Sequence, residues 1–141
     1  MPERERVLTV VRGWVAKAEN DLKTAVHTVK LGADCPTDTV CFHAQQTVEK
    51  YLKALLALRG IDFPKTHDVE ELMGLVPPAD RPEIPDDAQG RLTDYATITR
   101  YPGDYEPISL TEARRAVSVA RRVRRAVRKV LPEDALPEMR E

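Results

Sequence analysis

Apolar residues recur at intervals of three and four along this chain of 141 residues. The clearest case is residues 37–59, which contain no glycine or proline and whose apolar stripe is Val40, Ala44, Val48, Leu52, Leu55 and Leu56. This spacing places the stripe on one face of a helix, whereas a strand would alternate with a period of two. Aromatic residues make up only 5% of the chain, less than a large β core usually contains. We therefore expect an all-α fold.

Glycines and capping residues set the limits of the first two expected helices. The first spans about residues 5–31, and Gly32 supplies its stop. The second begins with Thr37 or Asp38 as its N-cap, because either side chain can accept the unpaired amides of the first turn. Gly60 closes this second helix.

Three further helices are expected in the second half of the chain. The third is short, with Thr66 as its N-cap and a pair of prolines after it. The fourth covers about residues 86–99, and the last covers 109–131. Ser109 and Glu112 have the spacing of a capping box at the start of the last helix.

Four long helices and one short one, joined by short connections, predict an up-and-down bundle. We expect a single domain over residues 1–131 and a loose tail over 132–141. No apolar run approaches the roughly 20 residues needed to span a bilayer. The charged N-terminus lacks the apolar segment of a signal peptide. The expected location is therefore the cytoplasm, without membrane association.

The residues that usually hold metals or activate nucleophiles are scattered. Cys35 and Cys41 form no C-x-x-C pair, so neither a zinc site nor a disulfide framework is indicated. His27, His43 and His67 are far apart, and no two are four residues apart. The sequence has no glycine-rich phosphate loop and no nucleophile elbow. We expect no metal and no cofactor, and the sequence leaves open whether the chain is an enzyme.

Positive charge is concentrated in the last expected helix. Residues 109–131 contain eight basic residues and one acidic residue, a net charge of +7, whereas the remaining 14 basic and 22 acidic residues give −8. Four arginines share a narrow helical stripe: Arg114, Arg121, Arg125 and Arg128. The stripe is either a solvated face or a series of contacts for phosphates, which guanidinium groups bind well.

A second polar stripe lies on the second helix and consists of His43, Gln46, Lys50 and Lys53. Glu49 lies four residues before Lys53 and can pair with it. The stripe is either an exposed face with one ion pair or a polar groove for a nucleotide or a partner subunit. The groove interpretation requires the Lys and Gln side chains to turn away from the bundle interior.

Short motifs along the chain carry a family resemblance. They are Ala18-x-x-Asp21-Leu22-x-x-Ala25, the string CFHAQQTVEKYLKA at residues 41–54, Thr66-His67-Asp68-Val69, and Arg100-Tyr101-Pro102. In order and spacing they resemble the HEPN family (higher eukaryotes and prokaryotes nucleotide-binding domains), in its small stand-alone prokaryotic type. The resemblance covers about residues 14–130, and the string in the second helix is its most specific part.

The resemblance implies a helical bundle that dimerises and, in many prokaryotic members, pairs with a small nucleotidyltransferase-fold protein. Such pairs often behave as toxin and antitoxin. Some family members bind nucleotides, and many cut RNA without a metal through an R-x(4–6)-H motif. No histidine here has an arginine at that spacing. The positions that carry over are Asp21, Lys50, Lys53, His67, Arg100 and Tyr101.

Three hypotheses follow from these patterns. The first is a nucleotide- or RNA-related binding module, with candidate ligand contacts at Lys50, Lys53, His43, Gln46, Asp21 and Tyr101. The second is a metal-independent ribonuclease in which His67 is the general base and Arg100 or Arg59 stabilises the phosphate. The third is a structural dimer without a ligand.

Overall fold

α-Helices form most of the chain in the computed structural model, which describes residues 3–97 and 107–137. The five helices are α1 (Glu3–Val29), α2 (Thr37–Leu58), α3 (Val69–Leu75), α4 (Asp86–Thr97) and α5 (Leu110–Val130). Within these residues no strand occurs. The predicted all-α fold is therefore confirmed, with five α-helices among the described residues.

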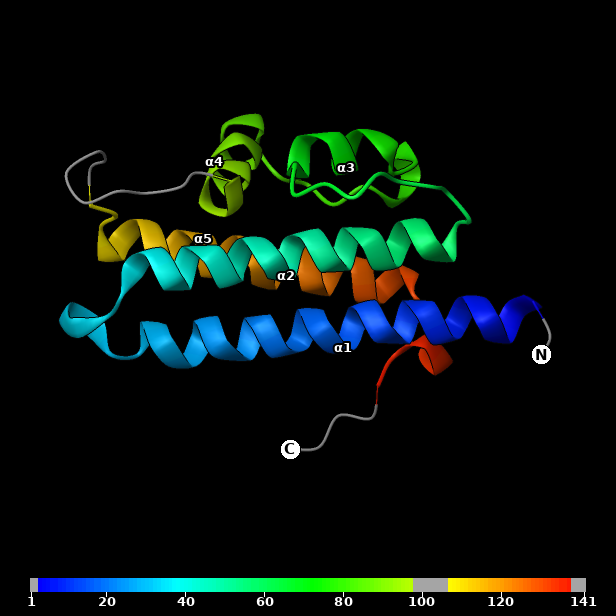
Figure 1. Ribbon diagram of the computed structural model, residues 1–141, viewed down its shortest axis with the longest axis horizontal. Coiled ribbons are helices and arrows are strands. Elements are labelled where there is room, and N and C mark those ends of the chain that lie inside the picture. The colour runs from blue at the N-terminus through cyan, green and yellow to red at the C-terminus, as the bar shows by residue number, and fades with distance from the viewer. Residues whose placement is uncertain (1–2, 98–106, 138–141) are drawn as a thin grey trace.

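The three longest helices, α1, α2 and α5, lie side by side with roughly parallel axes (Figure 1). α1 and α2 form an antiparallel pair, and α5 packs against both. α3 and α4 cover the side of α2 that faces away from α1, and α4 lies across the axis rather than along it. Because α3 and α4 carry the chain back to the other end, α5 runs in the same direction as α2 (Figure 1).

Helix α2 is at the centre of the fold, in contact with all four other helices. Its Tyr51, Leu52, Leu55 and Leu56 are fully buried. Burying one such aliphatic side chain contributes about 1.5–3 kcal/mol relative to leaving it exposed. A helix covered on several sides also buries its polar residues, and this determines where the polar stripe of α2 lies.

Two glycines end helices as expected. Gly32 and Gly60 have positive φ values of 64° and 68°, a conformation that L-residues other than glycine adopt only at a cost. Each therefore allows the chain to leave the helix that precedes it.

The N-caps agree with the sequence analysis at one of three helices. At α5, Ser109 accepts the Glu112 amide at 3.0 Å, as expected. At α3 the expectation was wrong, because Asp68 rather than Thr66 is the cap. The α2 cap was also wrong, because the N-cap is Pro36 and makes no side-chain bond. The Thr37 hydroxyl instead donates to the Ile108 carbonyl at 2.7 Å, which ties α2 to the segment before α5.

The segment after α5 packs on the bundle over residues 133–135. Glu133–Ala135 form a 3₁₀ turn, and Ala135 is fully buried. The turn packs on α1, and the Arg12 guanidinium donates to the Asp134 carbonyl at 2.7 Å. Short chain segments after a last helix stay near the fold when they bury apolar atoms in this way.

Candidate functional site

Three carboxylates, Glu19, Asp21 and Glu49, hold most of the candidate polar residues. Glu19 and Asp21 lie on α1 and Glu49 on α2. Each accepts a hydrogen bond from a basic side chain, which offsets the cost of burying the charge. The lysines of the expected α2 stripe, Lys50 and Lys53, are therefore paired with carboxylates of the protein itself.

Asp21 joins two members of that stripe to α1. The His43 ring nitrogen Nδ1 lies 2.8 Å from one carboxylate oxygen of Asp21, and the Lys50 ammonium donates to the other. Asp21 is buried, and the side chain of Lys50 is 19% exposed. The three residues fasten α2 to α1, which accounts for their position without any ligand.

Glu49 is the centre of the second cluster and is 2% exposed. It accepts from Gln45 Nε2 at 2.9 Å and from Lys53 Nζ at 2.9 Å, and His67 Nδ1 lies at 2.8 Å. Burial raises the pKa of Glu49, but the hydrogen bonds from Gln45, Lys53 and His67 outweigh it and hold the pKa below its ordinary value. The expected Glu49–Lys53 pair is confirmed.

The orientation expected for the α2 stripe was wrong. Gln46 and Lys53 are 9% and 6% exposed and point into the Glu49 cluster rather than away from the bundle. The Lys53 ammonium also lies 5.3 Å from the Trp14 ring centre and 5.9 Å from that of Phe63. The reason is the central position of α2, which leaves little of its surface to solvent.

His67 differs from the rest of the Glu49 cluster because its side chain is 59% exposed. It lies in the segment before α3, and its backbone carbonyl accepts from Gln45 Nε2 at 3.1 Å. Glu49 thus holds the imidazole at Nδ1, while most of the His67 side chain is open to solvent. Arg100 and Tyr101, the other loop residues of the expected site, lie outside the described residues.

Glu19 forms a third cluster, which sequence reasoning missed. The Arg124 guanidinium donates to both of its oxygens, at 2.8 and 3.0 Å, and the Tyr51 hydroxyl donates at 2.6 Å. Burial raises the pKa of Glu19, but the hydrogen bonds from Arg124 and Tyr51 lower it below its ordinary value. The available signal was a glutamate beside Ala18 in the apolar stripe of α1.

Arg128 belongs to this cluster and not to the expected arginine stripe. Its guanidinium lies 3.8 Å from Glu19 and 3.5 Å from the Tyr51 hydroxyl. Its side chain is 16% exposed. The helical angle alone could not show this inward turn, because it depends on a carboxylate supplied by α1.

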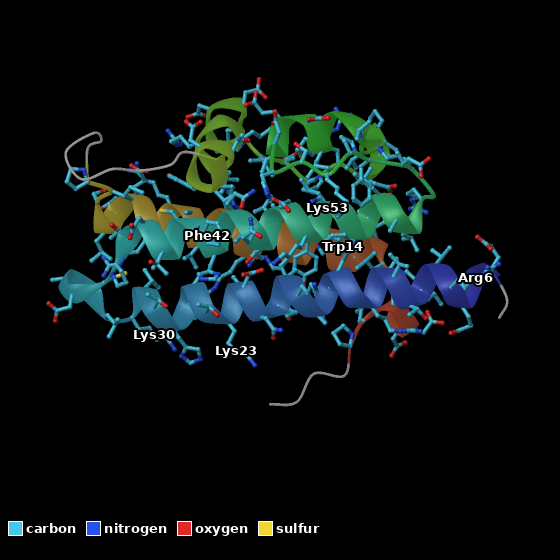
Figure 2. The ribbon with its side chains drawn as sticks, viewed as in Figure 1. Arg6, Trp14, Lys23, Lys30, Phe42 and Lys53 are labelled. Carbon is cyan, nitrogen blue, oxygen red and sulfur yellow. The ribbon has the colours of Figure 1, made fainter. Side chains whose placement is uncertain are left out.

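An open groove of about 630 Å³ runs between α1 and α5. Its basic lining residues are Lys23 and His27 from α1 and Arg121, Arg124 and Arg125 from α5. Glu19 is its only acidic lining residue among the described part of the chain, and that carboxylate is paired with Arg124. Figure 2 shows Lys23 on the edge of α1 that faces away from α2.

A second hollow of about 380 Å³ continues the first along α5. The two share Arg121 and Arg125, and the second adds Arg114, Ser118 and Val117. Arg114, Arg121 and Arg125 are exposed and make no ion pair within residues 3–97 and 107–137. We name the two hollows together the α1–α5 groove. It gathers three of the four arginines of the expected stripe.

The described residues offer no group of three or more His, Cys, Asp or Glu side chains arranged to hold a metal ion. Among the same residues, no helix is long and apolar enough to cross a membrane.

Comparisons with known proteins agree on a family. The family model for the HEPN domain matches residues 11–130. The crystal structure of TT1696 from Thermus thermophilus has 28% sequence identity and a TM-score of 0.70, with 86% of this chain and 98% of that chain covered. The structure of ST0689, an archaeal HEPN homologue, has 28% identity and a TM-score of 0.64, covering 85% and 96%. No curated protein matched the sequence.

Proposed function

This chain belongs to the HEPN domain family, and on that premise we propose that it is a binding module for the phosphates of nucleotides or RNA. The observation that carries the proposal is the α1–α5 groove, in which exposed arginines of α5 face basic residues of α1. Guanidinium groups bind phosphate oxygens through paired, charge-assisted hydrogen bonds. The groove therefore takes the ligand-binding role that the sequence assigned to α2.

Local charge supports this location. Lys23, Arg121 and Arg125 are exposed cations on the groove wall. The carboxylate of Glu19, which could have opposed them, is occupied by Arg124 and Tyr51. A phosphate entering the groove therefore meets cations whose charge is not cancelled locally, and their attraction is screened mainly by salt.

Calorimetric titration with ATP and with a ten-nucleotide RNA at about 50 mM salt tests the proposal, because phosphate contacts are strongest at low salt. The double variant Arg121→Gln/Arg125→Gln removes two groove cations, and we expect its affinity to fall by tenfold or more. The matched control is Arg122→Gln/Lys129→Gln, which removes two exposed cations of the same helix that do not line the groove. Equal losses in both variants, or no binding by the unchanged protein, would remove the proposal.

The family supports two further parts of the proposal: that the chain forms a homodimer, and that it pairs with a nucleotidyltransferase-fold protein in a toxin–antitoxin-type pair. Light scattering after size-exclusion chromatography tests the dimer, and a monomer mass at all concentrations would contradict it. Co-purification with a nucleotidyltransferase-fold protein encoded by the adjacent gene tests the pairing, and its failure at low salt would contradict that part.

A second candidate function is metal-independent RNA cleavage with His67 as the general base. One observation favours it: Glu49 lies at Nδ1 of an exposed imidazole, and an imidazole that donates from Nδ1 can accept a proton at Nε2. Arg59, one expected partner, is instead paired with Asp80 at 2.7 Å. This function is supported if the unchanged protein cleaves RNA and a folded His67→Ala variant does not. Intact RNA after incubation with the unchanged protein would remove it.

A further inference from the structure

We propose that the α1–α5 groove holds successive phosphates of one single-stranded polynucleotide, and not a single nucleotide. The inference rests on the proposed function and adds the class of ligand. It follows from the length of the groove, from the spacing of its cations and from the kind of side chain that lines it.

The length of the groove is the first argument. Its two hollows are continuous through Arg121 and Arg125, and they extend along α5 from Arg114 to Arg125. Eleven residue steps of about 1.5 Å give a span of about 16 Å. Each strand of a DNA duplex advances about 3.4 Å per nucleotide along the helix axis, and an unstacked single strand is more extended, so the span holds at most about five nucleotides.

The spacing of the cations is the second argument. Arg114, Arg121 and Arg125 are separated by seven and four residues, or about 10 and 6 Å along the helix. On the opposite wall, Lys23 adds one more cation. Cations in such a series cannot all contact one phosphate group. They suit a chain of phosphates that lies parallel to α5.

The two walls are also in register. α1 and α5 run in opposite directions (Figure 1). The later α1 residue Val29 accordingly lines the hollow with Arg114, whereas Lys23 lines the hollow with Arg124 and Arg125. Cations of both walls thus line the first hollow, where a backbone would be held from two sides.

The lining side chains are the third argument. Among the described residues that line the groove, no Trp, Tyr or Phe occurs, and the apolar members are Ala16, Leu22, Val26, Val29, Val117 and Pro137. Sites that select a base usually stack it on an aromatic ring or enclose it with specific polar groups. The groove has no Trp, Tyr or Phe ring on which a base could stack, and its uncharged polar lining side chains are limited to Asn20, His27 and Ser118 among the described residues. We therefore expect it to bind the backbone with little preference for the base.

The opposite side of the molecule repels such a ligand. Residues 62–97 contain nine acidic and three basic residues, a net charge of −6. They include α3 and α4, which lie across α2 from α1 (Figure 1). This charge asymmetry steers a polyanion toward the α1–α5 groove.

The test measures affinity against ligand length by fluorescence anisotropy, with ATP, dinucleotides, and five- and ten-nucleotide oligo(U) and oligo(A) as the probes. We expect affinity to rise steeply up to about five nucleotides and then only slightly. The slope of log K against log salt should reach about −2 to −3, since each single-strand phosphate contact contributes about −0.7. Oligo(U) and oligo(A) of one length should bind within about threefold of each other.

Arg114 gives the sharpest variant because it lies at the far end of the groove. Arg114→Gln should weaken binding of the five-nucleotide RNA by about three- to tenfold and leave ATP binding unchanged. Arg115→Gln is the matched control, since Arg115 is the exposed neighbour that does not line the groove.

Three outcomes separate this inference from the function on which it rests. If ATP binds as tightly as the five-nucleotide RNA with the same salt slope, the polynucleotide inference is overturned while phosphate binding stands. A preference of more than tenfold for one base also overturns it. If neither ATP nor RNA binds, the proposed function fails as well.

Discussion

Replacing Glu49 by glutamine should destabilise the fold strongly, because Glu49 is the buried counter-charge of Lys53. The Glu49 side chain is 3% exposed and that of Lys53 is 8% exposed, with 2.9 Å between the carboxylate and the ammonium. Glutamine keeps the shape and one acceptor oxygen but removes the negative charge. The Lys53 ammonium then stays buried without a counter-ion.

The expected magnitude follows from what is lost. Breaking a buried ion pair by removing one partner costs about 3–5 kcal/mol. Since Lys53 also lies near the rings of Trp14 and Phe63, which attract cations, we expect the lower end, about 3 kcal/mol. For a chain of this size, such a loss should lower the melting temperature by about 10 °C.

Urea unfolding monitored by circular dichroism measures the change. Asp87→Asn is the matched control, because Asp87 pairs with Arg91 at 3.3 Å on the surface and both side chains are more than half exposed. That control should cost less than about 0.5 kcal/mol.

A second variant separates the buried charge from the lost hydrogen bonds. Adding Lys53→Met to Glu49→Gln removes the unpaired ammonium, and the double variant should regain at least about 1 kcal/mol relative to Glu49→Gln alone. A Glu49→Gln protein within about 1 kcal/mol of the unchanged protein, or a double variant no more stable than the single one, would refute the reasoning.

Three further predictions concern stability. The pKa of Glu49 is lower in the folded protein than its ordinary value of 4.5. Its ionised form therefore stabilises the fold above that pH, and this stabilisation is lost as the pH falls through the folded pKa. In urea unfolding from pH 7 to pH 3, the free energy of unfolding should fall less steeply for Glu49→Gln than for the unchanged protein. Tyr51→Phe removes a buried donor to Glu19 and should cost about 1–2 kcal/mol in the same assay; an unchanged midpoint contradicts this. Gly60→Ala should cost about 1 kcal/mol through its positive φ alone, since an added Cβ has no neighbour within 4 Å; a stabilised variant would contradict it.

The sequence was sufficient for the fold because the helix signals are local. The stripe from Val40 to Leu56 and the stops at Gly32 and Gly60 depend on spacing and backbone conformation within one segment. The wrong caps show the limit of such signals. Thr37 bonds to Ile108, which is distant in sequence, and no local rule could indicate that partner.

The candidate site was predictable only in part, for the same physical reason. The helical angle correctly grouped Arg114, Arg121 and Arg125 along α5. Arg128 does not line the groove with them, because its guanidinium lies near Glu19 of α1. Lys53 and Gln46 were grouped correctly by spacing, but their direction depends on how many helices surround α2. Spacing determines which residues share a face of a helix, whereas tertiary packing determines whether that face meets solvent.

NMR chemical-shift mapping can locate the phosphate site on the protein. A five-nucleotide RNA is titrated into protein labelled with nitrogen-15, and backbone amide and arginine Nε signals are followed. We expect the largest shifts at Lys23, Arg121 and Arg125, with His67 and Lys53 nearly unchanged. Shifts concentrated at His67 and Lys53, with the α1–α5 groove unaffected, would contradict this location.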